Sequence, residues 1–210
     1  MDKQFAIFDM DGTLIDSMIF WKNLATEYLS SKGVNQIPED MPERIKPMTM
    51  SESAALFQQE FGLSGDPEAE MNAMMDEHYR NDIPLKPGAM KYLQRLRSRG
   101  VRMCVASATA EPLMEACLKR LGVRDYFEFV LSCETVGAGK RSPLVYQESA
   151  GRLHAAPAEI AVYEDALYAI QTAKAAGYYV VGVYDGSAAK NWQTIENLAD
   201  EIVLNWEEIV

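Results

Sequence analysis

The chain has 210 residues, of which 48% are hydrophobic, enough to bury the core of one domain with or without an inserted subdomain. It has 20 lysines and arginines and 31 aspartates and glutamates, so the formal net charge is −11. This charge argues against loose electrostatic binding to nucleic acid or anionic lipid, and any anionic ligand must be held by a local positive site.

Short apolar runs recur along the chain, and each is followed by a segment that reads as a helix. The runs do not alternate apolar with polar residues, which is typical of parallel strands that helices cover on both faces. They span residues 5–8, 103–106, 129–131, 160–163, 180–183 and 202–204. This alternation of strands and helices predicts an α/β fold built on a doubly wound parallel sheet.

About ninety residues separate the first predicted strand from the second, far more than one crossover helix requires. Within this stretch, residues 17–32, 49–61 and 66–81 have helical periodicity, and no strand of comparable strength appears. We therefore predict two domains. Residues 1–16 and 89–210 should form the α/β core, and residues 17–88 an inserted α-helical cap.

Two aspartates follow the first predicted strand directly. Asp9 and Asp11 are two residues apart, so in an extended chain their side chains point the same way, and Gly12 allows a tight turn behind them. A calcium-binding EF-hand loop needs glycine at its sixth position and glutamate at its twelfth, whereas here Gly12 is fourth and Phe20 is twelfth. The pair therefore indicates a different site for a hard cation.

A second acidic pair, Glu164 and Asp165, follows the strand predicted at residues 160–163. Such a pair can simply cap the next helix. However, the carboxyl ends of parallel strands share one edge of a sheet, so both acidic pairs should converge there. Four crowded carboxylates repel strongly unless a divalent metal lies among them. We therefore expect a metal ion among Asp9, Asp11, Glu164 and Asp165.

The same edge should carry groups that bind a phosphate. Ser107 ends the second strand, and its hydroxyl with the backbone amides that follow, beginning at Ala108, would suit a phosphate beside a helix N-terminus. Taken alone, such a serine is also an ordinary helix cap. Lys140 lies in the loop after the third strand. A loop lysine is usually just solvated, but this one is the nearest cation to an acidic edge, and a phosphate there would need it.

These motifs identify a resemblance that covers nearly the whole chain. Through Asp9 to Thr13, Ser107, Lys140 and Glu164–Asp165, the chain resembles the haloacid dehalogenase superfamily, in the subgroup with a helical cap inserted after the first motif. Residues 163–177 are especially similar to sugar-phosphate phosphatases and beta-phosphoglucomutases. One position departs from the family, because Arg141 stands where proline usually follows the lysine. The resemblance implies a Rossmann-like core.

The resemblance also implies roles for the acidic residues. Asp9 would attack phosphorus, while Asp11 would protonate the leaving oxygen and later take a proton from water. A Mg²⁺ ion would be held by Asp9, the backbone carbonyl of Asp11 and Asp165, with Glu164 beside it. The implied activity is hydrolysis of a small phosphomonoester, such as a sugar phosphate, through an aspartyl-phosphate.

Other activities compete with hydrolysis. A phosphomutase similar to beta-phosphoglucomutase would return the phosphoryl group to a sugar hydroxyl. Such mutases resemble one another in a histidine shortly after the first motif that helps to gate the general acid, and this chain has Trp21 there, which favours the phosphatase. A catalytically silent phosphate-binding protein would usually have lost a motif residue. Dehalogenation is disfavoured, because similar dehalogenases lack the second aspartate, which is retained as Asp11.

Phe20 and Trp21 begin the first predicted cap helix, close to the nucleophile in sequence. They are candidates for contact with the substrate, and apolar packing explains them equally well. His78 has no evident partner in the sequence, so we expect it to be an exposed cap residue and not a substrate ligand.

The expected partner is a small phosphorylated metabolite, and we expect a cytoplasmic monomer that binds neither nucleic acid nor membrane. The first 20 residues lack the apolar stretch of a signal peptide, and no apolar run approaches the ~20 residues needed to span a bilayer. Cys104, Cys117 and Cys133 lack metal-ligand spacing, so we expect reduced, inert thiols.

Overall fold

The computed structural model describes residues 3–45, 48 and 50–209. The chain divides into two compact units. Met1–Ser17 and Ile83–Val210 form the first, here called the core unit, and Met18–Asp82 forms the second, here called the insert unit. Each unit has buried apolar residues of its own.

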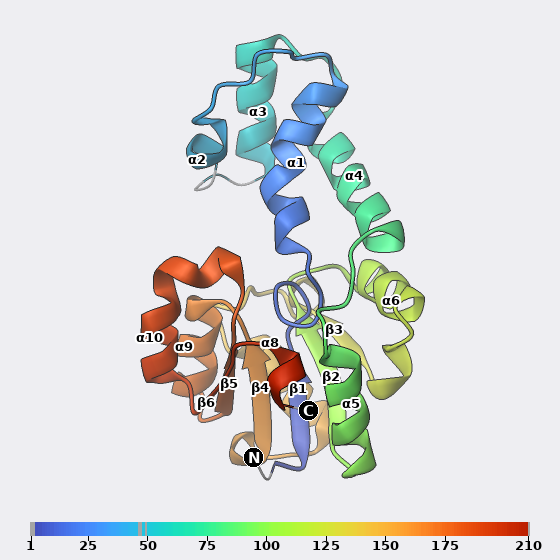
Figure 1. Cartoon of the computed structure of the whole chain (residues 1–210), viewed down its shortest axis with the longest axis vertical. Helices are drawn as coiled ribbons and strands as arrows, with labels where there is room; N and C mark the ends of the chain where they lie inside the picture. Colours follow the sequence, from blue (N-terminus) through green and yellow to red (C-terminus); the bar gives the residue numbers. More distant parts are fainter. Residues whose placement is uncertain (1–2, 46–47, 49, 210) are drawn as a thin grey trace. The chain divides into compact units, whose positions relative to one another are not determined.

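Within the described residues, the core unit is built on a six-stranded sheet in the order β3-β2-β1-β4-β5-β6 (Figure 1). The strands are β1 (Phe5–Phe8), β2 (Arg102–Ser107), β3 (Val130–Ser132), β4 (Ile160–Glu164), β5 (Tyr179–Val183) and β6 (Glu201–Val203). Every neighbouring pair runs parallel, so the predicted doubly wound sheet is confirmed. The chain order reverses between β1 and β4, and such a reversal is where ligands bind in sheets of this kind.

Helices connect the strands of the core unit. They are α5 (Ala89–Ser98), α6 (Glu111–Arg120), α7 (Cys133–Val136), α8 (Leu144–Leu153), α9 (Leu167–Ala175) and α10 (Trp192–Leu198). α5 begins after Gly88, which has a φ of 83°. A Cβ at this position would lie 2.5 Å from the backbone nitrogen of Glu207, so both the conformation and the close approach require glycine.

Successive strand residues point to opposite faces of the sheet, and both faces are buried at the central strands β1 and β4. On one face, Ile7 packs in a cluster with residues of α8, α9 and α10. On the other face, Phe8 stacks on Tyr163 at 4.2 Å, and both rings contact Trp206. Tyr92 of α5 joins them, since its hydroxyl lies 2.7 Å from that of Tyr163. This two-sided burial explains why β1 and β4 show no alternation of apolar with polar residues.

The core unit also contains the segments through which the chain leaves for the insert unit and returns. Ile15 and Leu85 form an antiparallel bridge. The amide of Asp16 donates to the carbonyl of Pro84 at 2.9 Å. The two segments therefore lie side by side, a few residues beyond the first acidic pair.

The described residues of the insert unit fold into helices. These are α1 (Met18–Ser31), α2 (Met41–Ile45), α3 (Met50–Phe61) and α4 (Pro67–Asn81). The helices predicted at 17–32 and 66–81 are confirmed within one residue at either end, while residue 49, the predicted start of another, lies outside the described residues. Tyr28 of α1 and Phe57 of α3 are buried against each other, with ring centroids 6.3 Å apart. No helix in the described part of the chain is long and apolar enough to cross a bilayer.

Candidate active site

Two neighbouring strands deliver acidic residues to the carboxyl edge of the sheet. Asp9 follows β1, Glu164 ends β4, and Asp165 comes next. The strands pair with Phe8 opposite Tyr163, and the amide of Asp9 continues the ladder by donating to the carbonyl of Tyr163 at 2.9 Å. The acidic residues therefore meet where the strand order reverses.

The carboxylates of Asp9, Glu164 and Asp165 form a compact buried cluster. One oxygen from each lies within 4.8 Å of the others, and the three residues are 6%, 1% and 5% exposed, respectively. Burying carboxylates is costly, because they lose their hydration and repel one another. The cluster therefore requires positive charge close by.

Lys140 supplies part of that charge. Its Nζ donates to Oδ1 of Asp9 and, at 2.5 Å, to Oε1 of Glu164, and the residue is only 6% exposed. The hydroxyl of Tyr146 donates to the same Glu164 oxygen at 2.8 Å. Burial lowers the pKa of Lys140, but the two carboxylates outweigh burial and raise that pKa. Lys140 is thus a fixed cation beside Asp9.

The cluster remains short of positive charge even with Lys140. Burial and neighbouring carboxylates raise the pKa of Asp9 well above its usual value, although Lys140 opposes them. Burial and the charge of Glu164 raise the pKa of Asp165 to about 7. If all three carboxylates are ionised, they and one ammonium carry a formal charge of −2, which one divalent cation would neutralise. Since all the ligand atoms are carboxylate oxygens, the cluster fits a hard cation such as Mg²⁺.

Asp11 lies in different surroundings. Its Oδ2 accepts hydrogen bonds from the hydroxyl of Thr109 at 2.7 Å and from the hydroxyl of Ser107 at 3.3 Å. Thr109 was not predicted, although a readable signal exists: it follows Ser107 by two residues, and its amide donates to the Ser107 hydroxyl at 3.1 Å in a local turn. The carboxylate of Asp11 is outside the three-carboxylate group found among the described residues. A metal contact through its backbone carbonyl stays a prediction.

Helix capping does not explain these polar residues. α6 begins at Glu111 with Ala110 as its N-cap, so Ser107 is not the cap. α9 has Ala166 as its N-cap, with no side-chain hydrogen bond to the helix end. Ser107 at the end of β2 donates to Asp11 instead, and Glu164 at the end of β4 accepts from Lys140 and Tyr146, so neither side chain is used by the helix that follows its strand.

The remaining predicted site residues lie in both units. Ala108 is exposed in the loop directly after β2. In the insert unit, the ring of Phe20 packs against that of His78, with centroids 4.9 Å apart. Trp21 Nε1 donates to the hydroxyl of Tyr79 at 3.2 Å. Contact of Phe20 and Trp21 with a substrate stays a prediction.

His78 is paired, so the expectation of an exposed histidine without a partner was wrong. Its Nδ1 lies 2.8 Å from the carboxylate of Asp82 and its Nε2 lies 3.1 Å from that of Glu27, and its side chain is 14% exposed. Asp82, four residues on, was the readable signal. Glu27 belongs to α1, so this histidine links α1 to α4.

The chain matches a known protein family over the range that contains the buried carboxylate cluster. The model of the haloacid dehalogenase-like hydrolases matches residues 4–177. The chain belongs to this family. The matched range contains Asp9, Lys140, Glu164 and Asp165, so the buried cluster lies in the part of the chain that the family shares.

Relatives of this haloacid dehalogenase-like hydrolase are named for reactions of phosphate esters. A phosphorylated carbohydrates phosphatase from Thermotoga maritima is 26% identical over 207 residues, covering 95% of each chain. The beta-phosphoglucomutase of Bacillus subtilis is 26% identical over 227 residues, covering 96% of this chain and 95% of the relative. A crystal structure from Thermotoga maritima, provisionally named a beta-phosphoglucomutase, has a TM-score of 0.83 at 25% identity, covering 98% of this chain and 96% of that one.

Proposed function

We propose that the protein is a phosphatase that hydrolyses small phosphomonoesters, sugar phosphates among them, through an aspartyl-phosphate on Asp9. The observation that carries the proposal is the ion pair between Asp9 and Lys140 inside a buried carboxylate cluster. Two like charges 4 Å apart repel by about 4 kcal/mol at an effective dielectric of 20. An anionic nucleophile that approaches an anionic phosphate therefore needs a fixed cation beside it.

In the first step, a carboxylate oxygen of Asp9 attacks phosphorus, and the bond between phosphorus and the ester oxygen breaks. Lys140 holds Asp9 in position beforehand, and its ammonium stabilises the negative charge on the phosphoryl oxygens during attack. Glu164 accepts hydrogen bonds from both Lys140 and Tyr146, so it gives the lysine a second anchor besides Asp9.

Asp11 carries the protons in this proposal. Asp9 is bonded to phosphorus in the intermediate, so a second carboxylate must protonate the leaving oxygen and then take a proton from the attacking water. The hydroxyls of Thr109 and Ser107 bind Oδ2 of Asp11. They restrict rotation of the carboxylate, and a fixed orientation is what a general acid requires.

The cofactor in this proposal is Mg²⁺, held by the carboxylates of Asp9 and Asp165 and the backbone carbonyl of Asp11, with Glu164 alongside. When bound, it would neutralise charge on the phosphoryl oxygens. The three buried carboxylates, which with Lys140 would carry a formal charge of −2 when all are ionised, support a divalent ion at this position.

A screen of phosphate esters tests the proposal. Release of inorganic phosphate would be measured for the wild type and for Asp9→Asn, with Mg²⁺ and with excess chelator. We expect turnover by the wild type with Mg²⁺ alone, and poor replacement by Ca²⁺, whose larger and looser shell misplaces the nucleophile. Turnover by Asp9→Asn would contradict the nucleophile, and full turnover in chelator would contradict the cofactor.

A phosphomutase is the second candidate, because the Bacillus subtilis beta-phosphoglucomutase is similar over nearly the whole chain. Trp21 favours hydrolysis, since its indole N–H donates to Tyr79 and an indole cannot take up a proton. The deciding assay incubates the enzyme with beta-glucose 1-phosphate, a trace of the 1,6-bisphosphate and Mg²⁺, and measures glucose 6-phosphate and free phosphate together. Rapid isomerisation with little phosphate release would favour the mutase over the phosphatase.

A further inference from the structure

Arg141 differs from other arginines of the chain in what it contacts. Five others form ion pairs with carboxylates: Arg44, Arg80, Arg102, Arg124 and Arg152. Arg141 forms no ion pair or hydrogen bond through its guanidinium within the described residues, and instead lies over the ring of Tyr168, 4.9 Å from its centroid.

The stacked pair lies at the same edge of the sheet as the candidate active site. Arg141 follows Lys140 directly, and Tyr168 is in the first turn of α9, three residues after Asp165. Burial is the main reason why the pKa of Tyr168 is raised, and the charge of Glu164 raises it further. The ring is therefore within electrostatic range of the carboxylate cluster.

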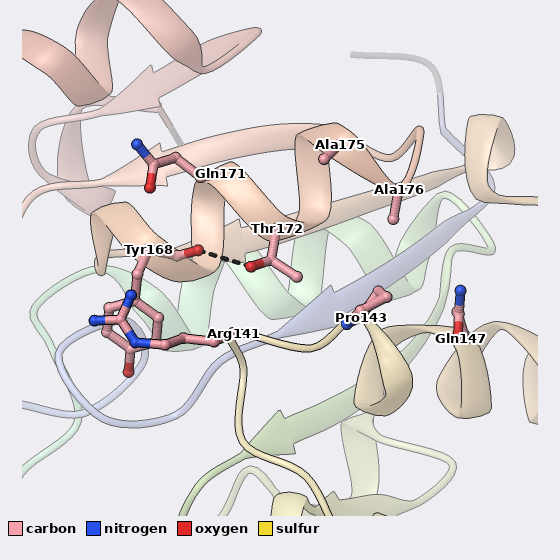
Figure 2. A pocket seen from close by; sticks show the side chains of 8 residues that line it. All are labelled: Arg141, Pro143, Gln147, Tyr168, Gln171, Thr172, Ala175 and Ala176. Carbon is pink, nitrogen blue, oxygen red and sulfur yellow. Dashed lines mark hydrogen bonds between the residues drawn. The ribbon is translucent and has the colours of Figure 1, made fainter.

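The pair also opens onto a groove of about 520 Å³ beside α9. Figure 2 shows Arg141 and Tyr168 together at one end of this groove and Gln147 and Ala176 at the other. Arg141 is the single charged residue among those that line it. No carboxylate of the lining therefore competes for the guanidinium.

We propose that Arg141 binds a second anionic group, a carboxylate or a second phosphate, on the leaving group of the substrate. This inference rests on the proposed phosphatase function. A guanidinium stacked on an aromatic face keeps its in-plane N–H donors available, and they match two oxygens of a carboxylate or phosphate. Stacking on Tyr168 also restricts the long side chain in advance, so less entropy is lost on binding.

Two matched pairs of esters test the assignment. 3-Phosphoglycerate and glycerol 3-phosphate share a three-carbon chain and differ in a carboxylate, while fructose 1,6-bisphosphate and fructose 1-phosphate differ in a second phosphate. The kcat/KM for phosphate release with Mg²⁺ would be measured for the wild type, Arg141→Gln and Arg141→Lys. For at least one pair, Arg141→Gln should lower kcat/KM for the more anionic ester about 10- to 100-fold more than for its partner, mainly through KM. Arg141→Lys keeps the charge but not the planar guanidinium. Its loss of kcat/KM for the more anionic ester should lie between that of the wild type, which is zero, and that of Arg141→Gln.

Arg97 offers a matched control, because it also stacks on a tyrosine, 5.2 Å from the ring centroid of Tyr126. It lies in the last turn of α5, before β2 begins, and hence at the opposite edge of the sheet. Arg97→Gln should keep the wild-type ratio for both pairs. If Arg141→Gln lowers kcat/KM equally for both members of each pair, or lowers it for neither, the role of Arg141 is disproved while the proposed phosphatase function stands. Failure of the wild type to release phosphate from every ester would reject the proposed function, and the inference with it.

Discussion

The candidate active site and the insert unit place their charges in opposite environments. The side chains of Asp9, Lys140 and Glu164, which form two ion pairs, are at most 7% exposed. The pair Arg80–Asp76 of the insert unit has side chains that are 46% and 40% exposed. Water screens an exposed pair to less than about 1 kcal/mol, whereas a buried charge loses hydration worth several kcal/mol. The destabilising burial of charge is thus found at the candidate active site, where carboxylates with shifted pKa values are typical of function.

The largest effect is expected when the proposed nucleophile in the buried cluster is removed. Asp9→Asn keeps the side-chain volume but cannot attack phosphorus, so kcat should fall by ~10³-fold or more. The thermal midpoint without Mg²⁺ should not decrease, because one fewer carboxylate relieves repulsion in the cluster. Steady-state phosphate release and thermal unfolding measure the two effects. Retained turnover in a pure sample would disprove the role of Asp9.

Removing the buried cation should affect stability as well as turnover. Lys140→Ala leaves Asp9 and Glu164 without their ammonium partner, so the free energy of unfolding without Mg²⁺ should fall by about 3–5 kcal/mol. Arg141→Ala, at an exposed position, should change it by no more than about 0.5 kcal/mol. Denaturant unfolding gives both values. Turnover of an ester without a second anionic group, such as glycerol 3-phosphate, should also fall more for Lys140→Ala than for Arg141→Ala. A larger loss of turnover for Arg141→Ala than for Lys140→Ala would mean that Arg141 is the cation that acts on the scissile phosphate.

A smaller and substrate-dependent effect is expected at Asp11. General acid catalysis contributes about 10²–10⁴-fold, and a leaving group that needs little protonation gains less from it. Asp11→Asn should therefore lower kcat/KM for alkyl phosphates by about 100-fold or more, and for an aryl ester such as 4-nitrophenyl phosphate by clearly less. Equal losses for the two kinds of ester would show that Asp11 is not the acid.

The smallest effect is expected in the insert unit and depends on pH. Burial lowers the pKa of His78, but the hydrogen bonds to Asp82 and Glu27 outweigh burial and raise it above its usual value. A pKa raised by folding means that the protonated ring stabilises the fold fully below about pH 6.5 and that this contribution is lost as the pH rises through the folded-state pKa. His78→Gln should therefore lower the thermal midpoint at about pH 6 more than at about pH 8.5, with a difference worth less than about 1 kcal/mol.

Arg80→Gln is the control for this pH dependence, because it breaks an exposed ion pair that contains no histidine. Its effect should be small and constant. A deficit of the His78→Gln protein that also stays constant with pH would contradict the pairing of a protonated His78 with Asp82 and Glu27.

Local patterns in the sequence were sufficient for most of the fold. Within the described residues, apolar runs without polar alternation located each of the six strands to within one residue at either end. Strand period and helix period are local properties, so they can be read from neighbouring residues. Parallel strands then share a carboxyl edge, and this explains why Asp9 and Glu164 could be expected to meet.

Other contacts of the site could not be read in this way. The hydroxyl of Tyr146 donates to Glu164, 18 residues away, and the hydroxyl of Thr109 donates to Asp11, 98 residues away. No periodicity relates such positions. Which side chain reaches which oxygen depends on how helices and loops pack around the sheet and on the rotamers that this packing selects.

The two aspartates of the first motif illustrate the difference between what local sequence predicts and what tertiary packing sets. Local sequence is enough to place Asp9 and Asp11 together at the end of a buried strand, because only a turn-forming Gly12 and a strand period of two are needed. The different partners of the two aspartates, Lys140 for Asp9 and two hydroxyls for Asp11, depend on how distant segments pack together. Hydrogen-bond partners are chosen within about 3 Å in space, and spacing along the chain does not specify distances between segments that fold onto one another.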